Sequence, residues 1–167
     1  MSKRPRIQIP LETFDYVIEL LSLTLLIITW YFVISSYAEL PDSIPTRFGI
    51  KGEPTEFNSK LILWVLPGLA TFIYGLMLVL TKFPHTHNYM VNITENNALK
   101  NYRFSIRVLR IVNFLCVLLF LYLTYHIVES AKGASLSLGR MFMPIVIGSS
   151  IILPIVLVIY QKKLNKS

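Results

Sequence analysis

The chain has 167 residues, of which 54% are apolar and only 15% are charged, and its mean hydropathy is +0.58. A soluble globular protein typically has about 25% charged residues, so this composition excludes a conventional water-facing domain. Cys116 is the only cysteine, which excludes a disulfide scaffold. The composition instead indicates a small helical membrane protein.

Four long stretches of the sequence carry no charged residue, and they lie at residues 20–38, 61–81, 111–128 and 141–160. Each is close to the roughly 20 apolar residues that a helix needs to cross a bilayer. We therefore predict an all-α fold, a four-helix transmembrane bundle that forms a single domain over residues 1–167. Its helices are expected at about 14–38, 60–81, 95–129 and 140–161, with an external loop at 39–59 and a cytoplasmic loop at 82–94.

The basic residues are distributed unequally about these stretches, and the net charge is +7. Eleven Lys and Arg residues precede the first stretch, lie between the second and third, or follow the fourth, whereas five lie in the other two loops. The positive-inside rule then predicts that both termini and the loop at 82–94 are cytoplasmic. No basic run belongs to a soluble module, so we expect the lipid bilayer and not nucleic acid as the partner.

Motifs that carry catalytic chemistry are missing from the sequence. His85 and His87 form a His-x-His pair, but a metal normally requires three or four ligands and few acids stand near them. No nucleophile elbow, phosphate-binding glycine loop or zinc-protease motif is found. We therefore expect no metal site, no cofactor and no enzymatic activity.

The first external loop, at residues 39–59, is the most informative segment. Prolines fix φ and glycines permit tight turns, so the loop is predicted to be ordered and compact. These residues are Pro41, Pro45, Pro54, Gly49 and Gly52. Ile44, Phe48 and Phe57 are expected to pack against the outer ends of the helices, and Ser59 is placed to cap the second helix.

Short motifs in this loop form a signature: Leu40-Pro41, Ile44-Pro45, Phe48, Gly52-Glu53-Pro54 and Ser59-Lys60. Set between a first and a second span, they resemble the signature of a bacterial membrane domain known as domain of unknown function 1648. Arg47 stands where that family usually has His, and Thr55 where it usually has Asp. The family includes small stand-alone proteins with several spans.

The resemblance also implies a function. This domain opens the immunity protein that protects sporulating bacilli against their own secreted killing factor. By that resemblance we expect an uncharacterised multi-pass protein of the bacterial inner membrane that acts in toxin immunity or signalling by binding through its external loop. A peptide toxin or another membrane protein is the partner that such a role implies. The alternative is a structural or accessory subunit of a larger membrane complex, with no recognition role of its own.

Charged residues in the loop are the candidates for contact with such a partner. Arg47, Glu53, Glu56 and Lys60 form its expected polar recognition surface. The alternative is that these charges are a solvated rim, whose exposed ion pairs contribute little to stability.

Two charged stripes are predicted at the cytoplasmic surface. Thr94 is expected to cap a long helix, on which Lys100, Arg103, Arg107 and Arg110 recur at intervals of three and four and share one face. On the approach to the first span, the residues with the same spacing are Glu12, Asp15 and Glu19. Either the two stripes pair across packed helices, or the basic stripe binds anionic lipid while the acids face water.

Overall fold

The computed structural model describes residues 4–49, 53–133 and 142–165. Within them the elements follow in this order: α1 (Thr13–Tyr37), β1 (Ser43–Phe48), β2 (Pro54–Ser59), the 3₁₀ turn η1 (Lys60–Trp64), α2 (Val65–Thr81), the 3₁₀ turn η2 (Pro84–Thr86), α3 (Glu95–Ala131) and α4 (Phe142–Leu164). Four helical segments in the described part of the chain are long and apolar enough to cross a membrane. They lie where the uncharged stretches predicted them.

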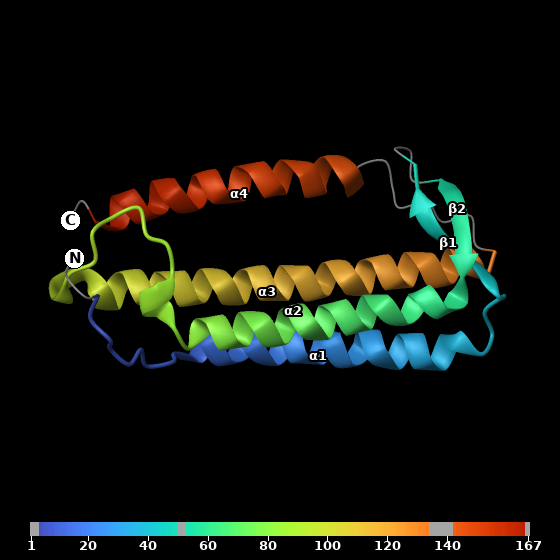
Figure 1. Cartoon of the computed structure of the whole chain (residues 1–167), viewed down its shortest axis with the longest axis horizontal. Coiled ribbons are helices and arrows are strands. Elements are labelled where there is room, and N and C mark those ends of the chain that lie inside the picture. Colours follow the sequence, from blue (N-terminus) through green and yellow to red (C-terminus); the bar gives the residue numbers. More distant parts are fainter. Residues whose placement is uncertain (1–3, 50–52, 134–141, 166–167) are drawn as a thin grey trace.

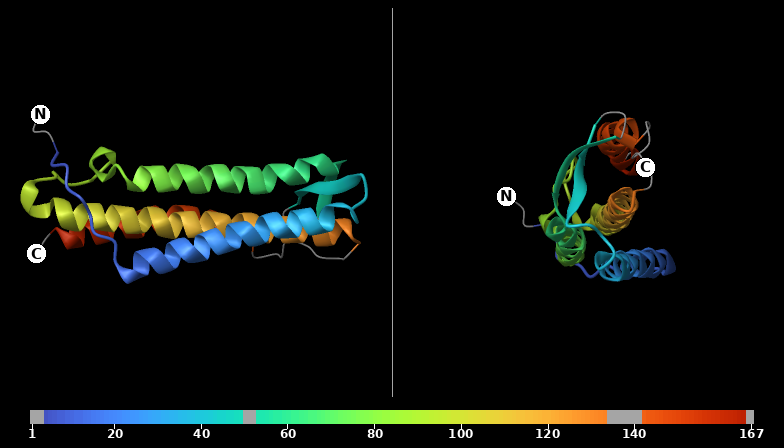
Figure 2. Two further views of the ribbon diagram at one scale, coloured as in Figure 1. Left: turned by 90° about the horizontal axis from the view of Figure 1, so that it is seen from below. Right: turned by 90° about the vertical axis from the view of Figure 1, so that its right-hand side faces the viewer.

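The molecule is elongated, and its helices follow its long axis (Figure 1). The strands β1 and β2 lie at one end, which we call the hairpin end. Both ends of the described chain lie at the other, which we call the terminal end. Figure 2 shows the same arrangement from below and from the hairpin end.

The expectation of an all-α fold is wrong in one respect, because the ordered external loop is a β-hairpin. β1 and β2 pair antiparallel, with Ser43 opposite Ser59 and Phe48 opposite Pro54, and the register is irregular on either side of Arg47. A loop of this length must satisfy its backbone N–H and C=O groups. Pairing with itself provides those partners while proline and the irregular register shorten the regular ladder.

The helix α3 is the spine of the bundle, and α1 and α2 both pack more extensively on it than on each other. Its 37 residues extend on the order of 55 Å at about 1.5 Å per residue, well beyond the ~30 Å hydrocarbon core of a bilayer. Thr94 is the N-cap residue of α3, as predicted, and in the capping box there its backbone N–H donates to the side-chain Oδ1 of Asn97 at 2.9 Å. The helix is therefore longer than an apolar layer is thick, so that its first turns can project from such a layer.

One face of α1 is built for close packing. Its buried residues beyond the first turns recur at intervals of four and three, and they are Ser22, Leu26, Thr29, Val33 and Ser36. The hydroxyls of Ser22 and Thr29 donate to carbonyls four residues earlier, each at 2.8 Å, so neither needs a partner on another helix. Small side chains at this spacing let two helix backbones approach closely without a water-driven hydrophobic effect.

The hairpin end has its own apolar cluster, to which four elements and the segment before β1 contribute. Its members are Val33, Leu40, Ile44, Leu63 and Val128. Ile44 of β1 is completely buried in it, as are Val33 of α1 and Val128 of α3. The hairpin is therefore part of the packed body of the protein.

Aromatic residues join α1 to α2 beside this cluster. The ring centroids of Trp30 and Trp64 lie 6.2 Å apart, and Tyr37 lies 5.1 Å from Trp64. The indole Nε1–H of Trp30 donates to Thr71 Oγ1 at 2.9 Å. These contacts hold the two helices together at the hairpin end.

At the terminal end, the segment before α1 lies against the loop after α2. The guanidinium of Arg4 donates to the carbonyl oxygens of His85 and His87 at 3.2 and 2.6 Å. The Tyr89 hydroxyl donates to the Pro84 carbonyl at 2.8 Å. Burial raises the pKa of Tyr89 to about 12, so this phenol stays neutral and keeps its donor role at physiological pH.

The helix α4 is the least enclosed of the four. Only 6% of its apolar stretch is buried, against 22% for α1 and for α3. It is tied to α3 near its C-terminal end, where Phe104 stacks on Tyr160 and the amides of Asn101 and Asn165 bond reciprocally at 2.9 Å. Most of its surface is therefore open to lipid or to another protein.

Ile44→Ala tests how firmly the hairpin is anchored. Removal of a completely buried Ile side chain typically costs 2–5 kcal/mol, so we expect the hairpin to open far more often. The measurement is the rate of tryptic cleavage after Arg47 in the detergent-solubilised protein, which should rise at least tenfold. Phe57→Ala, at a position 58% exposed, is the matched control and should leave the rate nearly unchanged. Equal rates in both variants would contradict the anchoring described above.

Candidate functional site

One strand of the hairpin anchors it to the bundle. Ile44 and Pro45 of β1 are buried, and Leu40 just before it is 4% exposed. The ammonium of Lys60 donates to the Leu40 carbonyl at 3.1 Å and lies 3.2 Å from Asp42 Oδ1. Lys60 is therefore a partly buried anchor of the hairpin, although the sequence placed it on the recognition surface.

The other strand is largely exposed. Phe57 on β2 is 58% exposed, so the expectation that it packs against the helices is wrong. The reason is that β1 contacts α3, which leaves β2 as the outer strand. Phe48 at the end of β1 is half-buried, as expected of a residue near the packed side.

Three of the four predicted recognition charges lie in the more exposed part of the hairpin: Arg47 near the end of β1, Glu53 before β2, and Glu56 on β2. Arg47 Nη1 pairs with Glu56 Oε2 at 2.8 Å, and the two side chains are 74% and 44% exposed. The Gly49 N–H donates to the Glu53 carbonyl at 2.8 Å and closes the hairpin. A Cβ on Gly49 would lie 2.5 Å from Glu53 Oε1, so a larger residue there would require the Glu53 side chain to move.

The remaining members of the loop signature have smaller roles. Pro41 and Pro54 are exposed. Ser59 accepts from the Leu61 N–H at 3.4 Å and starts the 3₁₀ turn η1, as its predicted capping role requires. Gly52 lies outside the described residues.

The second predicted group, the charged stripes, meets at the terminal end, where α1 packs on α3. Arg110 Nη1 lies 2.9 Å from Asp15 Oδ1, and Arg110 Nε lies 3.4 Å from Glu19 Oε2. Asp15 and Arg110 are 3% and 7% exposed, so the charges are withdrawn from solvent. Of the two arrangements expected for the stripes, the structure has the paired one.

The outer part of this ion-paired cluster is more exposed. Glu12 pairs with Arg103 at 3.2 Å and with Arg107, and Arg107 Nε also lies 3.8 Å from Asp15 Oδ1. The backbone N–H of Glu12 donates to Asp15 Oδ2 at 2.8 Å, so Asp15 also fixes the start of α1. Lys100 is not a member: its ammonium donates to the Leu164 carbonyl at 2.8 Å.

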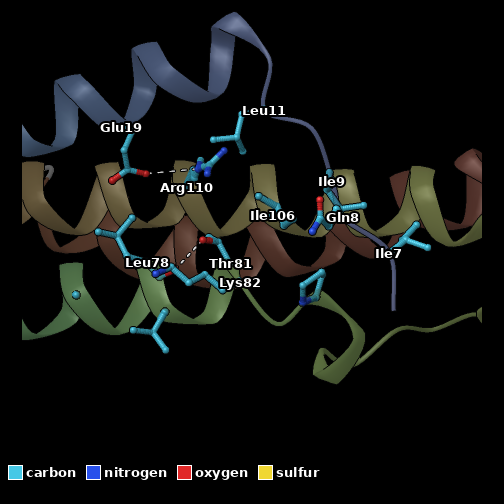
Figure 3. Close-up of a pocket in the computed structure, with 13 residues that line it drawn as sticks. Ile7, Gln8, Ile9, Leu11, Glu19, Leu78, Thr81, Lys82, Ile106 and Arg110 are labelled. Atoms are coloured by element: carbon cyan, nitrogen blue, oxygen red, sulfur yellow. Dashed lines mark hydrogen bonds and ion pairs between the residues drawn. The ribbon is translucent and has the colours of Figure 1, made fainter. Parts of the chain in front are cut away.

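A third contact extends the cluster to α2. The Tyr74 hydroxyl donates to Glu19 Oε1 at 2.7 Å, which ties α2 to the face of α1 that carries the acids. Figure 3 shows Glu19 and Arg110 facing each other across the gap between α1 and α3. Tyr74 is a member of this site that the charge spacing does not predict, although a phenol inside an apolar helix requires a hydrogen-bond partner.

Among the described residues, no group of three or more His, Cys, Asp or Glu side chains is arranged to hold a metal ion. His87 is occupied by Ser105 Oγ at 2.6 Å and the Leu80 carbonyl at 3.0 Å. The candidate functional surface is the exposed part of the hairpin, which includes Phe57 and Glu56 of β2 and Arg47 near the end of β1.

Comparison with known proteins concerns mainly the hairpin and the helices beside it. Residues 24–71 match the family model described as "Domain of unknown function (DUF1648)". This stretch of the chain is similar to the DUF1648 family. Its matched residues cover most of α1, the hairpin, η1 and the start of α2, so the resemblance predicted from the loop signature is confirmed.

The chain is also similar to an uncharacterised archaeal protein. An uncharacterised protein of Archaeoglobus fulgidus is 33% identical over 66 residues, which are 40% of this chain and 36% of that protein. The alignment therefore spans about a third of the relative. No solved structure matches the chain.

A double-mutant cycle tests the buried part of the ion-paired cluster. Arg110→Gln leaves the buried Asp15 carboxylate without its main partner, and we expect a loss of about 3 kcal/mol in unfolding free energy. Combining it with Asp15→Asn should recover part of that loss, with a coupling of about 0.5–3 kcal/mol. Denaturation in detergent micelles measures each variant. Arg47→Gln, which breaks an exposed pair, is the control and should cost less than about 1 kcal/mol. Strictly additive losses would show that Asp15 and Arg110 are not coupled.

Proposed function

We propose that the protein is a non-enzymatic multi-pass protein of the bacterial inner membrane whose outward hairpin binds a partner, in toxin immunity or signalling. The observation that carries this proposal is that one part of the hairpin is buried against the bundle while another part is exposed. Ile44 and Pro45 near the start of β1 are buried and anchor the hairpin, whereas Phe57 of β2 and the pair between Arg47 of β1 and Glu56 of β2 are exposed. A rigidly held aromatic residue beside charged groups is the composition of many binding hot spots.

The proposed orientation has the hairpin outside the cell and both termini in the cytoplasm. It is supported by the unequal distribution of Lys and Arg between the loops. The described termini also lie together at the end opposite the hairpin (Figure 1). An even number of spans would produce that arrangement.

Cysteine labelling tests the orientation. In a Cys116→Ser background, Phe57→Cys should react with a membrane-impermeant maleimide in intact cells, because Phe57 is exposed at the hairpin end. Thr86→Cys, exposed in η2 at the terminal end, should react only after the cells are permeabilised. Reaction of Thr86→Cys in intact cells would reverse or refute the proposed topology.

Photocrosslinking tests binding at the hairpin and can capture a partner of any identity. With p-benzoylphenylalanine in place of Phe57, we expect a discrete adduct on irradiation of cells, and Arg47→Glu in the same chain should weaken it. The same substitution at Phe83, a 48% exposed Phe at the terminal end, is the matched control. Identical adducts at both positions, or none at Phe57, would refute recognition by the hairpin.

A second candidate function is a structural or accessory subunit of a larger membrane complex. The observation that favours it is the open surface of α4, where exposed residues include Ile145, Ile152 and Ile159. Such a subunit should leave the membrane in a stoichiometric complex. An immunity protein should instead protect sensitive cells when it is expressed alone, and a toxin gene beside its own gene would supply the peptide for that assay.

A further inference from the structure

A cleft of about 710 Å³ opens between α1 and α2 at the terminal end. Ile106 and Arg110 of α3 form its floor, and the segment before α1 borders it (Figure 3). Its walls are mainly apolar and include Ile7, Ile9, Leu11, Leu78 and Val79. The volume is within the range of about 300–1,000 Å³ that small-molecule sites occupy.

The cleft exists because α1 and α2 are held together only in part. Trp30 joins them at the hairpin end, whereas the ion-paired cluster holds the start of α1 on α3. At the deep end of the cleft, Tyr74 reaches Glu19, and the next residue of α2 is Gly75. A Cβ on Gly75 would meet no atom within 4 Å, so the absence of a side chain leaves this space open.

The charges around the cleft favour an anion. Glu19 is compensated, because it accepts from Tyr74 and pairs with Arg110. Lys82 at the end of α2 is exposed and forms no ion pair with any residue that the structure describes. Arg110 is 7% exposed and is compensated by Asp15 at 2.9 Å and by Glu19 at 3.4 Å, so among the charged residues that line the cleft Lys82 is the one without an ion pair.

From these features we infer that the cleft binds an acidic phospholipid. Lys82 holds the headgroup phosphate, and one acyl chain lies along the apolar walls between α1 and α2. Basic pockets between transmembrane helices on the cytoplasmic side are recurrent sites for anionic headgroups. The inference rests on the membrane insertion in the proposed function, and it is independent of what the hairpin binds.

Native mass spectrometry of the full-length protein in detergent tests this inference. The probes are phosphatidylglycerol, phosphatidylcholine and glycerol phosphate, each titrated separately. We expect one phosphatidylglycerol bound per chain, at least fivefold tighter than phosphatidylcholine, and no retention of glycerol phosphate. Equal affinity for the two lipids would overturn the anionic preference, and retention of glycerol phosphate alone would overturn the role of the acyl chain.

Two pairs of variants locate the site. Gly75→Leu fills the deep end of the cleft and should abolish the preference for phosphatidylglycerol. Gly68→Leu, on the same helix and also with no atom within 4 Å of the added Cβ, should bind as the wild type does. Lys82→Gln should weaken binding about fivefold, whereas Lys162→Gln, at an exposed lysine of α4, should not.

Circular dichroism and the labelling pattern of Phe57→Cys and Thr86→Cys establish that each variant is folded and inserted. If Gly75→Leu and Lys82→Gln both retain wild-type affinity for phosphatidylglycerol, the lipid binds elsewhere and the inference fails. A dimer that carries no lipid and that Gly75→Leu dissociates would assign the cleft to a second copy of the chain, and would also overturn it. Absence of the Phe57 crosslink alone would refute partner recognition by the hairpin and would not contradict the lipid site.

Discussion

A guanidinium withdrawn from water must keep anions beside it, because a buried charge without compensation costs several kcal/mol. In this chain Arg110 on α3 keeps Asp15 and Glu19 of α1 within 3.4 Å. That requirement fixes where α1 starts and how it is rotated on α3. The position of α1 in turn brings Glu19 to Tyr74 and determines where α1 and α2 diverge. The same ion pairs therefore stabilise the interface between α1 and α3, and the cleft lies beside them.

The rest of the bundle has only small regions of apolar packing between its helices. Its apolar clusters are small, and many large apolar side chains on all four helices are exposed. In water such a surface would promote aggregation, whereas a lipid environment makes it the expected exterior. Contacts between helices depend on small buried residues such as Ser22, Thr29 and Ala70, which permit close backbone approach. The polar anchors at the two ends then set which helices are neighbours.

Much of this organisation could be predicted from the sequence, since it depends on local patterns. The long uncharged stretches predicted the four helices. The three- and four-residue spacing of the charged residues predicted which of these residues share one face of a helix. The hairpin was missed because proline and the irregular register around Arg47 hide the alternation that marks a strand. The exposure of Phe57 depends on which strand contacts α3. The cleft at the terminal end depends on the divergence of α1 and α2, which the chain connects at the hairpin end. Both are properties of the assembled bundle.

The two tryptophans of the chain provide a built-in optical reporter. Trp30 and Trp64 lie 6.2 Å apart beside the hairpin, and Tyr37 is next to Trp64. All indole emission therefore comes from one end of the molecule, and the distance between the rings is short enough for efficient energy transfer between them. A change in the environment of the hairpin alters the whole tryptophan fluorescence signal, whereas an event confined to the terminal end leaves that signal unchanged. Unmodified protein thus distinguishes, by its intrinsic emission alone, on which side of the bundle a ligand acts.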